Sequence, residues 1–102
     1  MYQLIKKLVR PNADTPWATP TLLDPEHVKY FGKNYIDTGK QIFRNAEDST
    51  DGLERIVTVL WESKEIWEEF EADPIMQAMR DSHSQNLINA GITEETISLT
   101  EI

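Results

Sequence analysis

The chain has 102 residues, among them 10 Lys and Arg, 18 Asp and Glu and no Cys, and its formal net charge is −8. This length predicts a single domain over residues 1–102. The missing cysteines exclude disulfides, thiolate nucleophiles and cysteine-ligated metals, and the acidity argues against nucleic-acid binding, which depends on neutralising phosphates. No segment reaches the roughly 18 apolar residues that cross a membrane, and no signal-peptide pattern opens the chain. We therefore expect a cytoplasmic protein with no membrane or nucleic-acid partner.

The charge is unevenly distributed. The first 46 residues have a net charge of +3, from seven basic and four acidic residues, and the remainder has −11, from three and fourteen. Acidic runs of this kind are typical of solvated helix faces, although an electrostatic recognition surface stays open.

Residues 2–10 alternate so that Tyr2, Leu4 and Leu8 share one face and Ile5 and Val9 the other. This pattern predicts a strand that is buried on both sides. Residues 11–24 contain three prolines and form a predicted loop. Trp17 in that loop is either a lid over a site or a plug in a hydrophobic gap.

Asp24-Pro25-Glu26 predicts a helix start, with Asp as N-cap and Pro at the first position. Val28, Phe31 and Tyr35 recur at helical spacing and define its inward face, which His27 and Asn34 flank. Gly39 ends the helix, and Gly32 predicts a close approach to a sheet.

Two strands follow, over residues 40–46 and 53–61, joined by a turn at 47–52 in which Asp51-Gly52 is the strongest signal. In the second of them, Val57, Val59 and Trp61 share one face and Ile56 and Leu60 the other. Ser63 then caps a short helix. Asp73-Pro74 interrupts it and starts another helix, whose inward face includes Met79 and His83 and which Gly91 stops. Residues 96–102 form the predicted last strand.

The order strand, helix, strand, strand, helix, strand predicts an α+β fold of the ferredoxin-like βαββαβ type. Its four-stranded antiparallel sheet has the helices on one face. Because the central strands are apolar on both faces, we expect a second copy of the chain to cover the other face.

The run Val57-Thr58-Val59-Leu60-Trp61-Glu62-Ser63-Lys64-Glu65, together with this element order, resembles the dimeric α+β barrel superfamily. That group includes antibiotic-biosynthesis-type monooxygenases, haem-degrading monooxygenases and muconolactone isomerases. The resemblance implies a homodimer with a pocket between sheet and helices. The haem-degrading pattern is missing, since the first strand has no Asn and its Trp and His positions are Phe70 and Arg80. We therefore expect no cofactor and no metal.

The candidate ligand-pocket residues are Trp17, Phe31, Asn34, Tyr35, Trp61, Met79 and His83. For acid–base chemistry the candidates are His27, Tyr35 and His83, because such side chains could help to deprotonate a ligand. A simpler interpretation of the aromatic residues and histidines is ordinary core packing.

Two functions stay open at this point, and the sequence does not decide whether the protein is an enzyme. The first is a small-molecule-binding dimer, such as a cofactor-independent monooxygenase or isomerase acting on a flat apolar or phenolic compound. The second is a non-catalytic dimer that binds a protein partner through its acidic surface or the loop 11–24.

Overall fold

The structure is a computed structural model that describes residues 1–18 and 20–102, so that Thr19 of the predicted loop lies outside the described residues. In chain order its main elements are β1 (Tyr2–Val9), α1 (Pro25–Phe31), β2 (Gln41–Asp48), β3 (Glu54–Trp61), α2 (Lys64–Ala72), α3 (Pro74–Ala90) and β4 (Thr93–Glu101). A 3₁₀ turn (Pro20–Leu22) precedes α1, and a π-helical turn (Gly32–Ile36) extends it.

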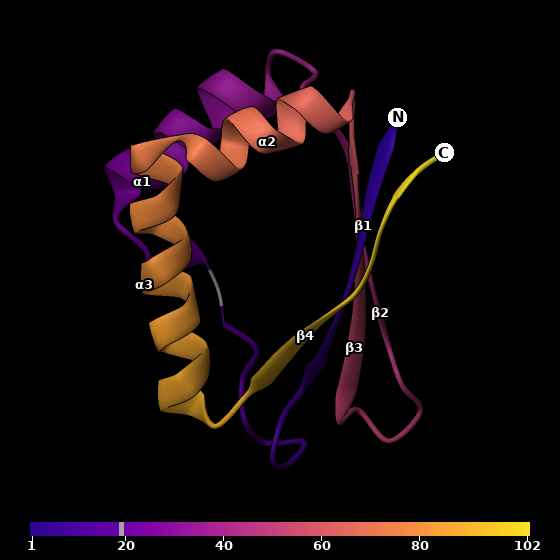
Figure 1. Cartoon of the computed structure of the whole chain (residues 1–102). Helices are drawn as coiled ribbons and strands as arrows, with labels where there is room; N and C mark the ends of the chain where they lie inside the picture. The colour runs from indigo at the N-terminus through magenta and orange to yellow at the C-terminus, as the bar shows by residue number, and fades with distance from the viewer. Residues whose placement is uncertain (19) are drawn as a thin grey trace.

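The four strands form one antiparallel sheet in the order β2-β3-β1-β4. Figure 1 shows the helices together on one side of this sheet, with the two chain ends next to each other. The predicted ferredoxin-like α+β fold, with four antiparallel strands and the helices on one face, is therefore confirmed. None of the helices in the described part of the chain is long and apolar enough to span a membrane.

The predicted helix starts are confirmed by their caps. The carboxylate of Asp24 accepts from the amide of Glu26, and the hydroxyl of Ser63 accepts from that of Ile66. Asp73 caps α3 by accepting from the amides of Ile75 and Met76. Each cap satisfies amides that the first helical turn leaves without partners.

Gly91 ends α3 in the left-handed conformation with φ 74°, as predicted. The prediction for Gly32 is wrong, because a Cβ added there would meet nothing within 4 Å. Three residues that we expected outside strands, Thr93 to Glu95, belong to β4. This strand is polar at its start and lies at the sheet edge, so no apolar alternation marks where it begins.

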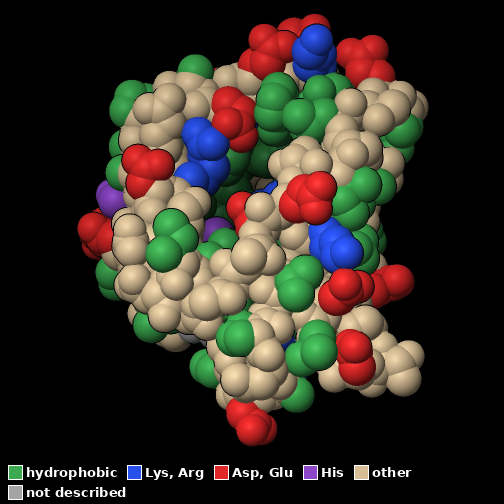
Figure 2. Space-filling model, turned by 60° about the horizontal axis from the view of Figure 1, so that its bottom comes forward, with side chains coloured by type: hydrophobic (Ala, Val, Ile, Leu, Met, Phe, Trp, Pro, Cys, Tyr) green, Lys and Arg blue, Asp and Glu red, His purple; other side chains and the backbone are tan. Residues whose placement is uncertain are grey.

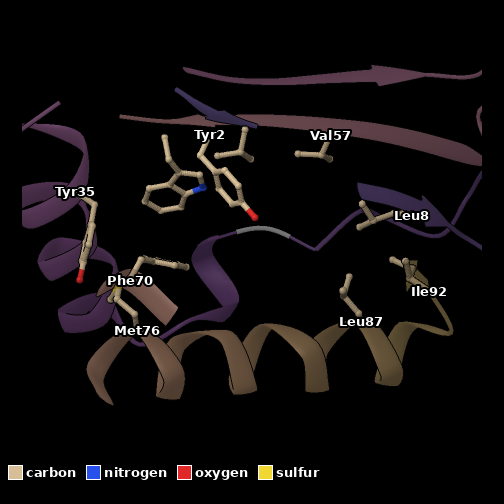
Figure 3. Packing of buried hydrophobic residues seen from close by; sticks show 10 residues of the cluster. Tyr2, Leu8, Tyr35, Val57, Phe70, Met76, Leu87 and Ile92 are labelled. Atoms are coloured by element: carbon tan, nitrogen blue, oxygen red, sulfur yellow. The ribbon is translucent and has the colours of Figure 1, made fainter. Parts of the chain in front are cut away.

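The two faces of β3 differ as the alternation predicts. Val57 is 4% exposed beneath the helices, whereas the neighbouring Ile56, on the open face, is 36% exposed. Figure 3 shows the buried side chains between sheet and helices, with Tyr35, Phe70 and Met76 at one end and Leu8, Leu87 and Ile92 at the other. The space between the two layers therefore has two distinct ends.

Candidate functional site

One end of the interlayer space is a closed aromatic cluster. The ring of Phe70 lies 4.7 Å from that of Trp61 and 5.3 Å from that of Tyr35, measured between centroids, and 5.9 Å from that of Phe31. Such edge-to-face and tilted contacts are the usual geometry of packed aromatic cores. Phe31, Tyr35 and Trp61, which the sequence placed in a ligand pocket, are thus packed against one another here.

A single carboxylate, that of Asp73, fixes the corner next to this cluster. Oδ2 accepts hydrogen bonds from the hydroxyls of Tyr35 at 2.7 Å and of Tyr30 at 2.8 Å. Partial burial raises the pKa of Asp73, but the bonds from Tyr35, Tyr30 and the two capping amides together lower it below its usual value. Burial and the bond to Asp73 raise the pKa of Tyr35, so this hydroxyl keeps its proton at neutral pH. Tyr35 is therefore a hydrogen-bond donor of the core.

At the other end, sheet, α3 and the loop after β1 enclose a cavity of about 60 Å³. Its charged or titratable lining residues are Lys6, Arg44, Arg55, His83 and Glu94. Its other lining residues are Leu8, Trp17, Ala18, Val57 and Leu87. The space-filling view in Figure 2 shows the surface hollowed, with hydrophobic side chains in the depth and acidic and basic ones around them. Of the seven predicted pocket residues, the cavity brings together Trp17 and His83.

The cations of the cavity differ in how far they are neutralised. Arg55 donates two hydrogen bonds to Asp48, at 2.7 and 3.1 Å. Lys6 lies 3.5 Å from the carboxylate of Glu94. The guanidinium of Arg44 makes no hydrogen bond or ion pair with any residue that the structure describes. Arg44 and Lys6 both interact electrostatically with the single carboxylate of Glu94, so the site has a local excess of positive charge.

Trp17 forms part of the cavity wall and is held by two arginines. The guanidinium carbons of Arg10 and Arg55 lie 4.7 and 4.6 Å from the centroid of its ring. Arg10 is itself fixed by donating to the carbonyls of Gly52 at 2.7 Å and Thr15 at 2.8 Å. The Trp17 ring is therefore in contact with two guanidinium groups, and it has no ring contact with the aromatic cluster among the described residues.

His83 faces the cavity from α3 and is half-buried. Desolvation lowers the pKa of its imidazole below 6.5; Lys6 and Arg44 lower it further, while Glu94 opposes them. The ring is thus neutral at pH 7 and able to accept a proton. A neutral base next to a cationic wall is an arrangement that can remove a proton from an acidic ligand and stabilise the resulting anion.

The remaining candidates lie outside this lining. On α1, Nε2 of His27 lies 3.9 Å from Asp24, and its buried Nδ1 has no hydrogen-bond partner among the described residues. The amide of Asn34 donates to the carbonyl of Tyr30 at 2.9 Å. Met79 is half-buried against the core. These three side chains therefore contribute to the helix layer and its packing.

Arg44, Arg55 and Glu94 line the cavity and were missed by the sequence analysis. The strand alternation contains a signal for Arg55, which is two residues before Val57 and shares its face. Arg44 pairs with Val59 across the sheet, so it too belongs to the helix-covered face. Charged residues that share a strand face with buried apolar residues could therefore have been predicted as lining the cavity.

The fold and the cavity define a class, the ferredoxin-like α+β proteins with a chamber between sheet and helices. No protein-family model matches the chain, and no curated protein matches it. Among solved structures it is similar to a candidate antibiotic biosynthesis monooxygenase from Deinococcus radiodurans. That likeness has 12% identity and a TM-score of 0.56 and covers 100% of this chain and 92% of the other.

It is also similar to Rv0793 from Mycobacterium tuberculosis, with 13% identity, 100% and 98% of the two chains covered and a TM-score of 0.49. At3g17210 from Arabidopsis thaliana follows with 14% identity, 97% of both chains covered and a TM-score of 0.42. At these identities the likeness concerns the fold alone.

Proposed function

We propose that the protein is a homodimer that binds a small acidic ligand in the cavity next to His83 and transforms it without a cofactor. The observation that carries the proposal is that His83 lines the same cavity as Arg44, whose side chain has no ion-pair partner among the described residues. Burial, which lowers the pKa of His83, supports it. His83 takes a proton from a ligand hydroxyl, and Arg44 and Lys6 stabilise the anion. Trp17 covers the ligand. Tyr35 has no part in this step, since its hydroxyl is committed to Asp73.

The resemblance to antibiotic-biosynthesis-type monooxygenases gives this step a consequence. An ionised phenolic ring is electron-rich enough to form a C–O bond with O₂. The peroxide takes up a proton and loses water, which leaves a carbonyl on the ring. One oxygen atom then enters the product and the other leaves as water, so the ligand itself supplies the electrons.

The volume restricts what can enter without movement. An engineered cavity of ~150 Å³ holds benzene, whereas this one measures about 60 Å³. A ring-bearing ligand therefore requires Trp17 to move outward. Its loop allows this more readily than the aromatic end would, because the arginine contacts on its ring are cation–π contacts, which contribute about 1 kcal/mol each at partly exposed sites.

The test uses 4-nitrophenol, whose ionised form absorbs visible light. We expect the wild type to bind 4-nitrophenol as the anion at a pH below the phenol's own pKa, so that the bound phenol has a lower apparent pKa than the free one. His83→Ala should abolish this lowering of the apparent pKa. His27→Ala is the matched control and leaves it unchanged. Oxygen uptake with dihydroxynaphthalenes, followed with the same three proteins, then tests turnover. An anionic spectrum that persists in His83→Ala contradicts the proposed base.

The homodimer rests on the open face of the sheet. Five apolar side chains point away from the helices there: Ile5, Val9, Phe43, Ile56 and Leu60. Exposed apolar surface of this extent on a sheet favours burial against a second copy. In this arrangement the two sheets face each other and the helix layers lie outside.

Two adjacent substitutions test the dimer separately from the fold. Ile56→Glu places a charge on the open face, and we expect a folded monomer by light scattering. Val57→Glu replaces a side chain that is 4% exposed beneath the helices with a larger, charged one. We expect it to lower the free energy of unfolding much more than Ile56→Glu does, because overpacking and the desolvation of a charge are both unfavourable even beside Lys6. A wild-type protein that is monomeric at micromolar concentration contradicts this arrangement.

A further inference from the structure

We infer that the ligand of the cavity carries a carboxylate group, which the guanidinium of Arg44 binds. The inference rests on the proposed small-molecule site, whose ligand class it names, but it does not require the proton transfer to His83.

The first step is the availability of donors. Arg55 already binds Asp48 through two hydrogen bonds, and Arg10 donates to two backbone carbonyls. The carboxylate of Glu94 lies next to Lys6. Among the guanidinium groups of Arg10, Arg44 and Arg55, that of Arg44 alone makes no hydrogen bond with a described residue, so its five N–H groups are available to a ligand.

The second step is accessibility. Arg44 is exposed as a residue on the edge strand β2, so a ligand can reach it from solvent. Its guanidinium is nevertheless close enough to protein atoms that desolvation lowers its pKa. Charge-assisted hydrogen bonds formed in such a partly dehydrated site are stronger than those formed in open water.

The third step concerns the shape and charge of the ligand. A guanidinium is a planar fork that matches the two oxygens of a carboxylate. Arg55 is already paired with Asp48 and Lys6 with Glu94, so one uncompensated positive charge remains in the lining, that of Arg44, and it matches a monoanion rather than a doubly charged phosphate. Leu8, Val57 and the Trp17 ring provide an apolar wall for the remainder of the ligand. A small aromatic or aliphatic monocarboxylate therefore fits best.

The surrounding charge supports the same choice. With a formal net charge of −8, the protein as a whole repels anions. Lys6, Arg44 and Arg55 are three cations facing one cavity, with Glu94 as the acidic residue in its lining. An anionic ligand is thus favoured at this place and disfavoured over most of the acidic surface.

The experiment is a calorimetric titration of the protein with benzoate and, in separate titrations, with benzyl alcohol and phenyl phosphate, which have a related shape but a different charge. We expect benzoate to bind at least tenfold more tightly than either. Arg44→Gln weakens benzoate binding about tenfold to a hundredfold, the usual range for a hydrogen bond to a charged group, and leaves benzyl alcohol unchanged. Lys33→Gln changes the net charge equally at an exposed site on the helix layer and is the matched control.

Arg44→Lys tests whether the paired donors of the guanidinium matter beyond its charge, since lysine retains the positive charge and loses the paired N–H groups. We expect it to recover only part of the benzoate affinity. Equal affinity in Arg44→Gln and the wild type overturns the inference, as does tighter binding of phenyl phosphate than of benzoate. No detectable benzoate binding overturns it as well.

The two proposals fail in different ways. Benzoate has no hydroxyl to ionise, so its binding through Arg44 supports the carboxylate inference even where His83→Ala leaves the 4-nitrophenol spectrum unchanged. Conversely, phenol ionisation that depends on His83, without benzoate binding, supports the proposed function and contradicts the inference.

Discussion

The two ends of the space between the sheet and the helices are built from different kinds of side chain. At one end four aromatic rings pack at 4.7 to 6.2 Å between centroids. At the other, charged side chains surround a cavity of about 60 Å³. Apolar packing contributes most to stability, whereas partly exposed ion pairs such as Arg55–Asp48 and Lys6–Glu94 contribute at most about 1 kcal/mol each. We therefore expect substitutions at the aromatic end to change stability and those at the cavity to change binding.

The largest expected effect is at the aromatic end. Phe70→Ala removes a buried ring and lowers the free energy of unfolding by about 3–5 kcal/mol, measured by urea denaturation. Ile88→Ala truncates an apolar side chain that is 68% exposed on α3, away from the open face of the sheet, and should lower it by less than half as much. Arg44→Gln should change it by no more than about 0.5 kcal/mol. Comparable losses from Phe70→Ala and Arg44→Gln would remove the distinction between the two ends.

An intermediate effect is expected at the corner next to the cluster. Tyr35→Phe removes a hydrogen bond to a carboxylate, worth about 1.5–3 kcal/mol. Asp73 keeps Tyr30 and two amides as donors, so we expect a loss near the lower end. Tyr30→Phe, at a less buried hydroxyl, is the matched control and should cost less.

The lowered pKa of Asp73 determines how the stability of the protein depends on pH at this place. The pKa of Asp73 is below 3.8 in the folded protein. Its stabilisation is therefore complete above the ordinary pKa and is lost as the pH falls through the lower, folded value. Tyr35→Phe removes a bond that lowers this pKa, so its acid unfolding should begin at a higher pH than that of the wild type. Identical acid transitions would contradict this role of the bond.

The smallest effect, and the one that sharpens the comparison most, concerns His83. We expect its NMR titration to show a pKa below 6.5. Arg44→Gln should raise this pKa, because it removes a cation that disfavours protonation, and Glu94→Gln should lower it further. Below pH 6.5 the unfolded chain binds more protons at this residue, so its contribution to stability rises with pH in that range. A pKa above 6.5 would contradict the proposed neutral base.

The helix boundaries and strand faces could be predicted from the sequence because the signals that define them lie within a few residues. Ser63, Asp73 and Gly91 each act within one helical turn of the end that they define, so three helix boundaries could be predicted from single residues. Alternation in β1 and β3 predicted which side chains share a face of the sheet for the same reason, but not which of the two faces the helices cover.

The candidate site was harder to predict because it depends on register between distant strands. Arg44 joins the cavity only because β2 pairs with β3 so that it lies opposite Val59, and Glu94 only because β4 starts earlier than its polar sequence indicates. The aromatic residues had the helical spacing of a pocket wall and of a core alike. Their ring contacts decide between the two, and spacing alone does not contain that information.

Asp73 has a consequence for how the molecule opens. Asp73 follows the last residue of α2 and caps α3. It also accepts hydrogen bonds from the hydroxyls of Tyr30 on α1 and Tyr35 on the π-helical turn that follows α1. Releasing any of these segments leaves the same carboxylate short of donors, so their local openings are linked. In hydrogen exchange, the amides at the start of α3 and in α1 should therefore become accessible together, as one cooperative unit distinct from the sheet.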